Sequence, residues 1–237
     1  MEKKLFLAAG YGSAKLPKQE VNFKGRFYKR ALLVLTGVTI LGLCVSKYAE
    51  PVLKALYGIR TPCVENKASL LNVAEKYHLD IASIVTVAPS EFQNVFKLFG
   101  KSIPEAIIFD RNGNHIEYKA TSRSCNAGLF SFIRGLDKNG VYRKDQNVDL
   151  SAVLVDLRDI NGNRLAPAYL DSTANFYILI SWTSFTGRLN KDHVQKWQSL
   201  AADNKNAKIQ VIEVNFDAQE CWPQTAKDNV LKMFGMK

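Results

Sequence analysis

The sequence predicts an α/β protein, a sheet flanked by helices, preceded by one N-terminal transmembrane helix. Short apolar runs typical of buried strands, such as "FYILISW" and "IQVIEVN", alternate with segments in which apolar residues recur at helical spacing. An uncharged run directly after a basic tail predicts the membrane helix. With 237 residues, 47% hydrophobic and 23% charged, the chain has the composition of a globular protein with a sizeable core.

The positive charge is concentrated in the tail, residues 1–30. The tail holds eight Lys and Arg against two Glu, a net charge of +6, which leaves +4 of the total +10 for the rest of the chain. No basic strip with interleaved aromatic residues follows residue 30, so nucleic acid is not an expected partner. Residues 23–30, "FKGRFYKR", suit anionic head groups, a cytoplasmic partner or an ordinary topology signal.

The run "ALLVLTGVTILGLCV", residues 31–45, reaches the length of a spanning helix, roughly 17 to 25 residues, when it is extended to residue 49. Because Lys and Arg favour the cytoplasmic side, the tail is expected in the cytoplasm. We therefore expect a single-pass helix at 31–49 in the lipid bilayer of a bacterial inner membrane, a stalk at 50–62 and a periplasmic domain at 63–237. The alternatives are a cleaved or lipidated signal segment, since "LGLC" resembles a lipoprotein box, and a buried core helix.

The first half of the exported part alternates helices and strands. Residues 66–80 have helical spacing, "IASIVTVA" is typical of a buried strand, and "PSEFQNVFKLFG" predicts a short helix with Ser90 as its cap and Gly100 at its end. "IPEAIIFD" and "HIEYKA" flank an Asn-Gly turn, which predicts a hairpin. "SCNAGLFSFIRGL" predicts a helix that begins at Ser124 or Asn126.

The second half opens with a polar stretch. Residues 137–150 have no periodic apolar set and predict a linker or a long surface loop. "AVLVDLRD" and "RLAPAYL" flank "INGN" and predict a second hairpin. "FYILISW" and "IQVIEVNFD" predict buried strands on either side of the helix "NKDHVQKWQSLAADN", and "PQTAKDNVLKMFG" predicts a closing helix. This alternation predicts a sheet covered on both faces.

The loop after "FYILISW" carries a resemblance to a known family. Trp182 ends the strand, and after three residues the chain reads Thr186, Gly187, Arg188, Leu189. Residues 155–217 resemble the opening half of the membrane-anchored thiol-disulfide oxidoreductases of the thioredoxin superfamily, whose pattern is Trp-x-x-x-Cys-Gly-x-Cys. Thr and Leu stand in place of the two cysteines, so this degenerate loop cannot carry out the family's disulfide exchange, which requires a thiolate.

The complementary half lies upstream. Residues 102–136 resemble the closing half of a thioredoxin, which consists of an Ile-Pro before a strand, a hairpin and a last helix. Ile103 and Pro104 match the cis-proline site of the family, whose preceding backbone binds an extended peptide. The resemblance places Cys125 beside the same groove.

Since the closing half comes first, two arrangements are open. In one, residues 63–237 form a single thioredoxin-like sheet from circularly rearranged halves. In the other, 63–136 and 150–237 form two subdomains joined by the polar linker. The single sheet is favoured because it leaves fewer strand edges uncovered.

Three cysteines, Cys63, Cys125 and Cys221, belong to the exported part, where a disulfide can persist. A structural disulfide between Cys63 and Cys125 would add about 4 kcal/mol of stability for a loop of that length. The alternatives for Cys125 are an inert unpaired thiol and a reactive thiol whose pKa is depressed at the start of a helix. Cys221 is expected to be a half-buried packing residue.

Metal and cofactor sites are not predicted. The histidines lie on a helix, a hairpin and a helix without the spacing of zinc ligands. They are His78, His115 and His193. The carboxylates on strands and hairpins form no evident convergent pair. They are Glu117, Asp156, Asp159 and Asp217. "DRNGN" and "DINGN" are turns rather than phosphate-binding loops.

The expected function is non-catalytic: a binding or assembly subunit of a cell-envelope complex, whose partners are other membrane or periplasmic proteins. The partner's extended segment would be held by strand addition or in the groove near Pro104. The rival is an enzyme, a thiol-disulfide oxidoreductase or redox accessory protein that uses Cys125 with Cys63 or Cys221. A purely structural anchor for another membrane protein is a third possibility.

Overall fold

The computed structural model describes residues 51–52, 54–100, 102–119, 121 and 125–235. The predicted cytoplasmic tail, the predicted membrane helix at 31–49 and the predicted cap residue Ser124 lie outside the described residues. No helix among the described residues has the length and apolar character needed to cross a membrane. From Pro51 onward the chain forms one compact unit.

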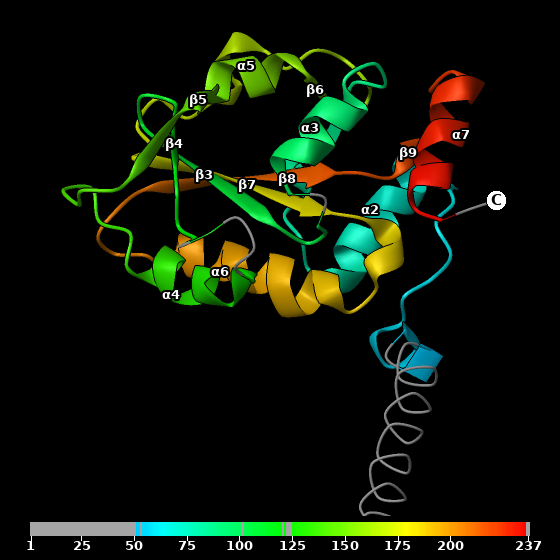
Figure 1. The fold of residues 1–237 in the computed structure, drawn as a ribbon, viewed down its shortest axis with the longest axis horizontal. Coiled ribbons are helices and arrows are strands. Elements are labelled where there is room, and N and C mark those ends of the chain that lie inside the picture. The colour runs from blue at the N-terminus through cyan, green and yellow to red at the C-terminus, as the bar shows by residue number, and fades with distance from the viewer. Residues whose placement is uncertain (1–50, 53, 101, 120, 122–124, 236–237) are drawn as a thin grey trace, which may run out of the picture. The chain divides into compact units, whose positions relative to one another are not determined.

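A seven-stranded sheet lies at the centre of this unit, in the order β5-β4-β3-β7-β8-β2-β6 (Figure 1). The strands are β2 (Ile84–Val87), β3 (Ala106–Asp110), β4 (Asn114–Ile116), β5 (Lys144–Asp149), β6 (Leu157–Asp159), β7 (Phe176–Trp182) and β8 (Ile209–Asn215). The three strands β7, β8 and β2 run parallel, and every other pairing in the sheet is antiparallel. A separate parallel pair joins β1 (Val64–Glu65) to β9 (Ala218–Gln219).

Helices cover both faces of the sheet, as the alternating pattern predicts (Figure 1). They are α2 (Lys67–Tyr77), α3 (Phe92–Leu98), α4 (Leu129–Arg134), α5 (Leu150–Val155), α6 (Lys196–Ala202) and α7 (Gln224–Met233). The apolar residues of α3, α5 and α7 pack in one core cluster, and those of α2, α4 and α6 pack in the other. The prediction of an α/β sheet flanked by helices is therefore confirmed.

The central strand shows why the apolar runs predict buried strands. All seven residues of β7 are buried, because Tyr177 and Leu179 enter one core cluster while Ile178 and Ile180 enter the other. One neighbour precedes it in the chain and the other follows it, since β7 pairs with β3 on one side and with β8 on the other. The strands of the two predicted halves thus lie in a single sheet.

Some element predictions are wrong. Residues 144–149, predicted as linker or loop, form the edge strand β5, which pairs with β4. The run "AVLVDLRD", predicted as a strand, is split between α5 and β6. Asp149 caps α5 by accepting hydrogen bonds from the backbone N–H groups of Ser151 and Ala152, and Leu150 and Val153 bury one helical face.

The second hairpin is reduced to a turn. A single antiparallel bridge joins Arg158 to Arg164, and "RLAPAYL" contains a short 3₁₀ helix, Pro167–Tyr169, in place of a strand. Ser90 does not cap α3, which begins after Glu91 with no capping hydrogen bond from a side chain. The first hairpin, β3–β4 around Gly113, is confirmed.

Candidate functional site

The loop that follows β7 is closed by its own side chains. It runs through a 3₁₀ turn, Ser184–Thr186, and a π-helical turn, Asn190–Gln195, into α6. Thr186 is only 5% exposed, and its Oγ1 lies 2.9 Å from both the carbonyl oxygen of Thr183 and Oδ1 of Asn190. The amide of Asn190 also donates to the carbonyl of Thr183, at 2.8 Å. A buried hydroxyl–amide cluster thus occupies the place where the resemblance implies a redox cysteine.

Residues 57–65, which we call the strap, cover this loop. The N–H of Arg188 donates to the carbonyl of Tyr57 at 2.7 Å, and the N–H of Arg60 donates to the carbonyl of Phe185 at 2.9 Å. Gly187, at φ +60°, lies so close beneath the strap that a Cβ there would be 2.3 Å from the carbonyl oxygen of Tyr57. Further along, β1 in the strap pairs with β9. The predicted stalk is therefore partly a packed element.

Beneath the strap, two carboxyl groups meet at the ends of β7 and β8. Ser184 Oγ lies 2.6 Å from Oε1 of Glu65 and 3.1 Å from Oδ1 of Asp217. The other oxygen of Asp217 accepts from the N–H of Ser184 and from the amide of Asn215, at 2.7 and 2.8 Å. Asp217 and Glu65 are 1% and 5% exposed. The sequence showed no partner for Asp217, because the second carboxyl lies in the predicted boundary between stalk and domain.

The pKa values of the two carboxyls move in opposite directions. Burial and the charge of the nearby Glu65 carboxylate raise the pKa of Asp217 to about 7. Burial also acts to raise the pKa of Glu65, but hydrogen bonds with Ser184 and Cys63 and the charge of Arg60 outweigh it, so this pKa is lowered. The opposite shifts are those of a coupled pair that holds one proton.

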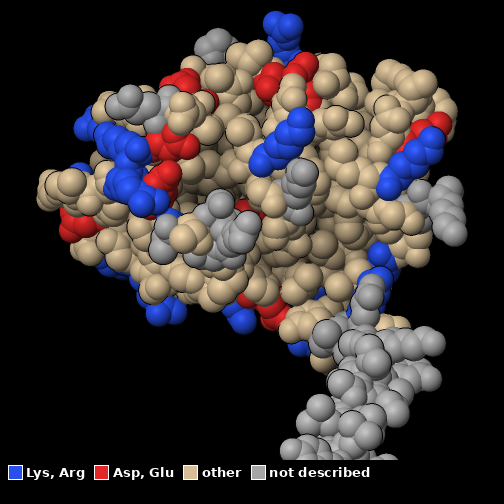
Figure 2. All heavy atoms as spheres, viewed as in Figure 1, with Lys and Arg blue, Asp and Glu red and all other residues tan. Residues whose placement is uncertain are grey.

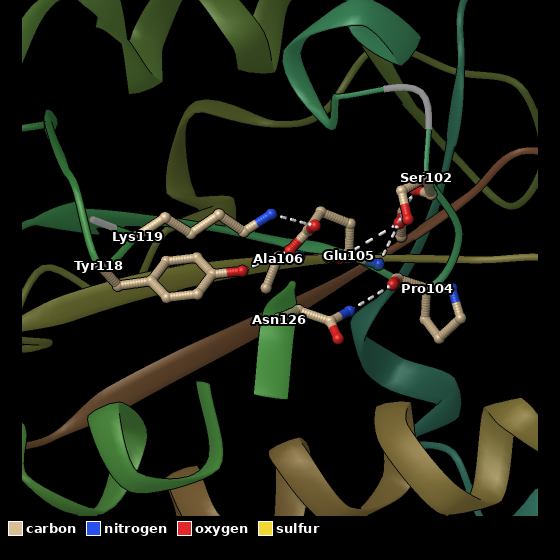
Figure 3. A network of polar contacts seen from close by, with 8 residues as sticks. Ser102, Pro104, Glu105, Ala106, Tyr118, Lys119 and Asn126 are labelled. Atoms are coloured by element: carbon tan, nitrogen blue, oxygen red, sulfur yellow. Dashed lines mark hydrogen bonds and ion pairs between the residues drawn. The ribbon is translucent and has the colours of Figure 1, made fainter. Parts of the chain in front are cut away.

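The segment before β3 forms a second polar network (Figure 3). The Ile103-Pro104 peptide bond is cis. Asn126 donates from its side-chain amide to the carbonyl of Pro104 at 2.9 Å, which brings the segment containing Cys125 to this proline. Glu105 and Ser181 exchange backbone and hydroxyl hydrogen bonds, including two of 2.8 Å. No hydrogen bond within the described part of the chain uses the peptide N–H or carbonyl of Ile103.

A pocket of about 270 Å³ adjoins this segment. Leu98, Phe99 and Ile107 supply apolar lining, and charged side chains from β5 and from the segments next to β3, β4 and β5 also line the pocket. Figure 2 shows basic and acidic side chains side by side on this face. Ion pairs join Lys119 to Glu105, Arg143 to Glu117 and Lys144 to Asp110, whereas His115, whose pKa is lowered by burial, lies 3.8 Å from Asp145.

Glu105 is the most buried of these charges, at 5% exposed. Its carboxylate accepts from the hydroxyl of Tyr118 and pairs with Lys119. Burial raises the pKa of Tyr118, and its hydrogen bond to Glu105 raises it further. Figure 3 shows Tyr118 and Lys119 both pointing at this carboxylate, which fixes the first residue after Pro104.

The thiols differ from the sequence prediction. Cys63, Cys125 and Cys221 are free and exposed, so the predicted disulfide between Cys63 and Cys125 is not formed in this structure, and Cys221 is not half-buried. Cys63 belongs to the strap and its Sγ donates to Glu65 at 3.2 Å, whereas Cys125 precedes the 3₁₀ turn that leads into α4. Within the described residues, no group of three or more His, Cys, Asp or Glu could hold a metal ion.

We expect Cys63 to be a slow nucleophile that is accelerated by Glu65→Gln. Partial burial, together with the hydrogen bond to Glu65 and its charge, raises the pKa of this thiol to about 11. The fraction of thiolate near neutral pH is therefore low. The measurement is the rate of alkylation by iodoacetamide at pH 8, resolved by peptide mass. Glu75→Gln, at an exposed position on α2, removes the same charge as a control and is expected to change nothing.

Comparisons with protein-family models, with curated proteins and with solved structures found no match for this chain. The chemistry open to the site follows from its own residues. The loop after β7 offers hydroxyl and amide groups under a cover of backbone, and the segment at Ile103 offers a peptide group beside a pocket. Such groups can bind an extended chain, and they provide no thiolate in the loop.

Proposed function

We propose that the chain is a membrane-anchored, non-catalytic subunit whose thioredoxin-like domain holds an extended segment of a partner protein at Ile103. The observation that carries the proposal is a contrast between two neighbouring regions. The loop after β7 is filled by Thr186 and Asn190 and covered by the strap. The N–H and carbonyl of Ile103 form no hydrogen bond within the described residues, and Ile103 lies between Gly100 and Glu105, which both line the pocket beside β3.

The strand arrangement supports a thioredoxin-like assignment. The strand before the degenerate loop, β7, is followed by a helix and by the parallel strand β8. On its other side lies β3, which follows Pro104 and leads through a hairpin to α4. These are the two halves that the resemblance implies, in rearranged order and in one sheet.

The proposed location and partners rest on the sequence. The basic tail at 1–30 and the apolar run at 31–49 favour an inner-membrane protein with a cytoplasmic N-terminus and a periplasmic domain. The partner would be a membrane or periplasmic protein of the same envelope complex. An extended segment placed at Ile103 would form backbone hydrogen bonds and would put side chains into the adjoining pocket, whose lining is apolar at its centre and charged around it.

The enzymatic alternative lacks support from the thiols. An oxidoreductase that used Cys125 with Cys63 would need one of them to be a ready thiolate. Burial and Glu65 instead raise the pKa of Cys63 to about 11. We therefore propose that the domain binds a partner and does not carry out disulfide exchange.

Site-specific photo-crosslinking tests the proposal. A photoreactive residue at Ser102, which is exposed and precedes Ile103, is expected to give one discrete adduct in intact envelopes. The same residue at Val141, which is 100% exposed on the loop before β5, is expected to give none. Equal labelling from both positions, or no adduct from Ser102, would contradict the proposal. Acceleration of insulin disulfide reduction by the full-length chain, lost in Cys125→Ser, would favour the enzyme.

A further inference from the structure

The contact between the strap and the end of the sheet depends on a chain of polar groups that needs a proton. The groups come from three places: Glu65 from the strap, Ser184 from the loop after β7, and Asp217 from the segment before β9. All three are nearly excluded from solvent, at 5%, 1% and 1% exposed. Water therefore cannot replace a missing hydrogen bond between them.

Counting hydrogens shows that the cluster is incomplete when both carboxyls are ionised. Ser184 Oγ lies within hydrogen-bond distance of both, at 2.6 Å from Glu65 and 3.1 Å from Asp217, but a hydroxyl has only one hydrogen. Without an added proton, one of the two carboxylates would face a hydroxyl oxygen that has no hydrogen left to donate. A proton on Oδ1 of Asp217 completes the chain, because Asp217 then donates to Ser184, which donates to Glu65.

The surrounding groups favour the proton on Asp217. Its other oxygen already accepts from the N–H of Ser184 and from the amide of Asn215. Glu65 has additional partners that favour its ionised form, since Cys63 donates to it at 3.2 Å and the Arg60 charge lies nearby. The raised pKa of Asp217, about 7, agrees with this assignment.

Among the described residues, the titratable groups that act on the pair are Arg60 and Cys63, both on the strap. Arg60 lies on the strap and donates to the carbonyl of Ser184 at 3.2 Å, so its charge partly offsets one carboxylate. Cys63 is also on the strap, and its raised pKa keeps it neutral. The other elements contribute neutral side chains: Ser184 from the loop after β7, Asn215 from the end of β8 and Ser69 from α2. One positive charge thus faces two carboxyls.

We propose that the strap is held by a proton-operated clasp: it stays docked while one proton is shared between Glu65 and Asp217, and it detaches when that proton leaves. Loss of the proton places two carboxylates on either side of one hydroxyl, in a site that excludes water. Detachment moves Glu65 away and lets both groups become hydrated. Since the strap contacts Phe185, Gly187 and Arg188, detachment also uncovers the loop after β7.

The sign of the pH effect follows from the direction of the shift. Asp217 binds its proton more tightly in the docked state than in the detached state, so docking weakens as pH rises from the ordinary carboxyl value to about 7. One proton released on detachment gives up to about a tenfold rise in the detachment constant per pH unit. The rise is expected between about pH 5 and about pH 7, with a plateau above.

Hydrogen exchange measured by mass spectrometry tests the clasp on the purified full-length chain. Peptides that cover residues 57–65 are followed from pH 5 to 9 and corrected with an unstructured peptide of the same sequence. We expect the protection of the strap to fall by up to about a hundredfold between pH 5 and 7, while β8 keeps its protection. A strap whose corrected protection does not change with pH would overturn the proposal without any variant.

Asp217→Asn removes the titrating proton and keeps the hydrogen bonds of the docked state. The asparagine amide can donate to Ser184 Oγ as the protonated acid does, and its oxygen can still accept from the N–H of Ser184. This variant is expected to keep the strap protected across the whole pH range. Asp228→Asn, at an exposed position on α7, makes the same charge change and is expected to behave like the unaltered chain. A pH dependence that persists in Asp217→Asn would also overturn the proposal.

Discussion

Replacing Gly187 with alanine is expected to displace the strap and to lower the free energy of unfolding by about 3 kcal/mol. The residue has φ +60° and ψ −129°, a backbone conformation that L side chains rarely adopt. The added Cβ would also lie 2.3 Å from the carbonyl oxygen of Tyr57 and 2.4 Å from that of Gly58. Both contacts are with backbone, so the strap as a whole must move.

Gly162→Ala is the matched control for this variant. Gly162 also has a positive φ, +84°, but a Cβ there meets nothing within 4 Å. It should therefore show only the conformational cost, about 1 kcal/mol. Urea denaturation gives both stabilities, and trypsin cleavage after Arg60 reports detachment of the strap. Equal stabilities with no faster cleavage in Gly187→Ala would show that the strap does not depend on the close approach.

Phe216→Ala is expected to lower the free energy of unfolding by about 4 kcal/mol. The ring is fully buried and lies 5.3 to 5.6 Å from three others, Phe92, Phe96 and Phe99, in edge-on contacts. Removing it leaves a cavity between α3 and the end of β8 and ends these contacts. Because Asp217 is the next residue, the variant should also loosen the clasp.

Phe234→Ala removes the same group from a position that is only partly buried. Phe234 lies at the end of α7 and contacts Phe92, Phe96 and Phe185 from the outside of the cluster. Its loss is expected to cost less, about 1 to 2 kcal/mol, because the site can be filled by solvent. Thermal and urea unfolding measure both variants. An equal effect of the two would mean that burial of Phe216 does not determine the packing of α3.

The buried strands of the fold could be predicted because both of their faces are covered. Such strands are continuous apolar runs, as in β7 and β8, and no choice of register is needed to recognise them. The edge strand β5, "KDQNVD", has no such signal, since an edge strand exposes most of its side chains and is often charged. In α5, five of the six residues are apolar, so the pattern reads as a buried strand as readily as a short helix.

The candidate site was predictable only where a local residue pattern marks it. The loop after Trp182 and the segment at Ile103 carry residue patterns of their own. The strap does not, because part of its contact with the loop uses backbone groups of Tyr57 and Arg60, which any sequence possesses. Glu65 and Ser184 lie 119 residues apart, so only the folded chain brings them together.

The strand order has a consequence for how the chain is made. Among the described strands, β2 pairs only with β6 and β8, and β3 pairs with β4 and β7. As synthesis proceeds from the N-terminus, β3 and β4 can close as a hairpin, but β2 has no neighbour until the second half emerges. The two central strands, β7 and β8, arrive late, and each must insert beside a strand made long before. A nascent chain released early would expose the apolar faces of β2 and β3, and folding of the sheet therefore awaits the completed polypeptide.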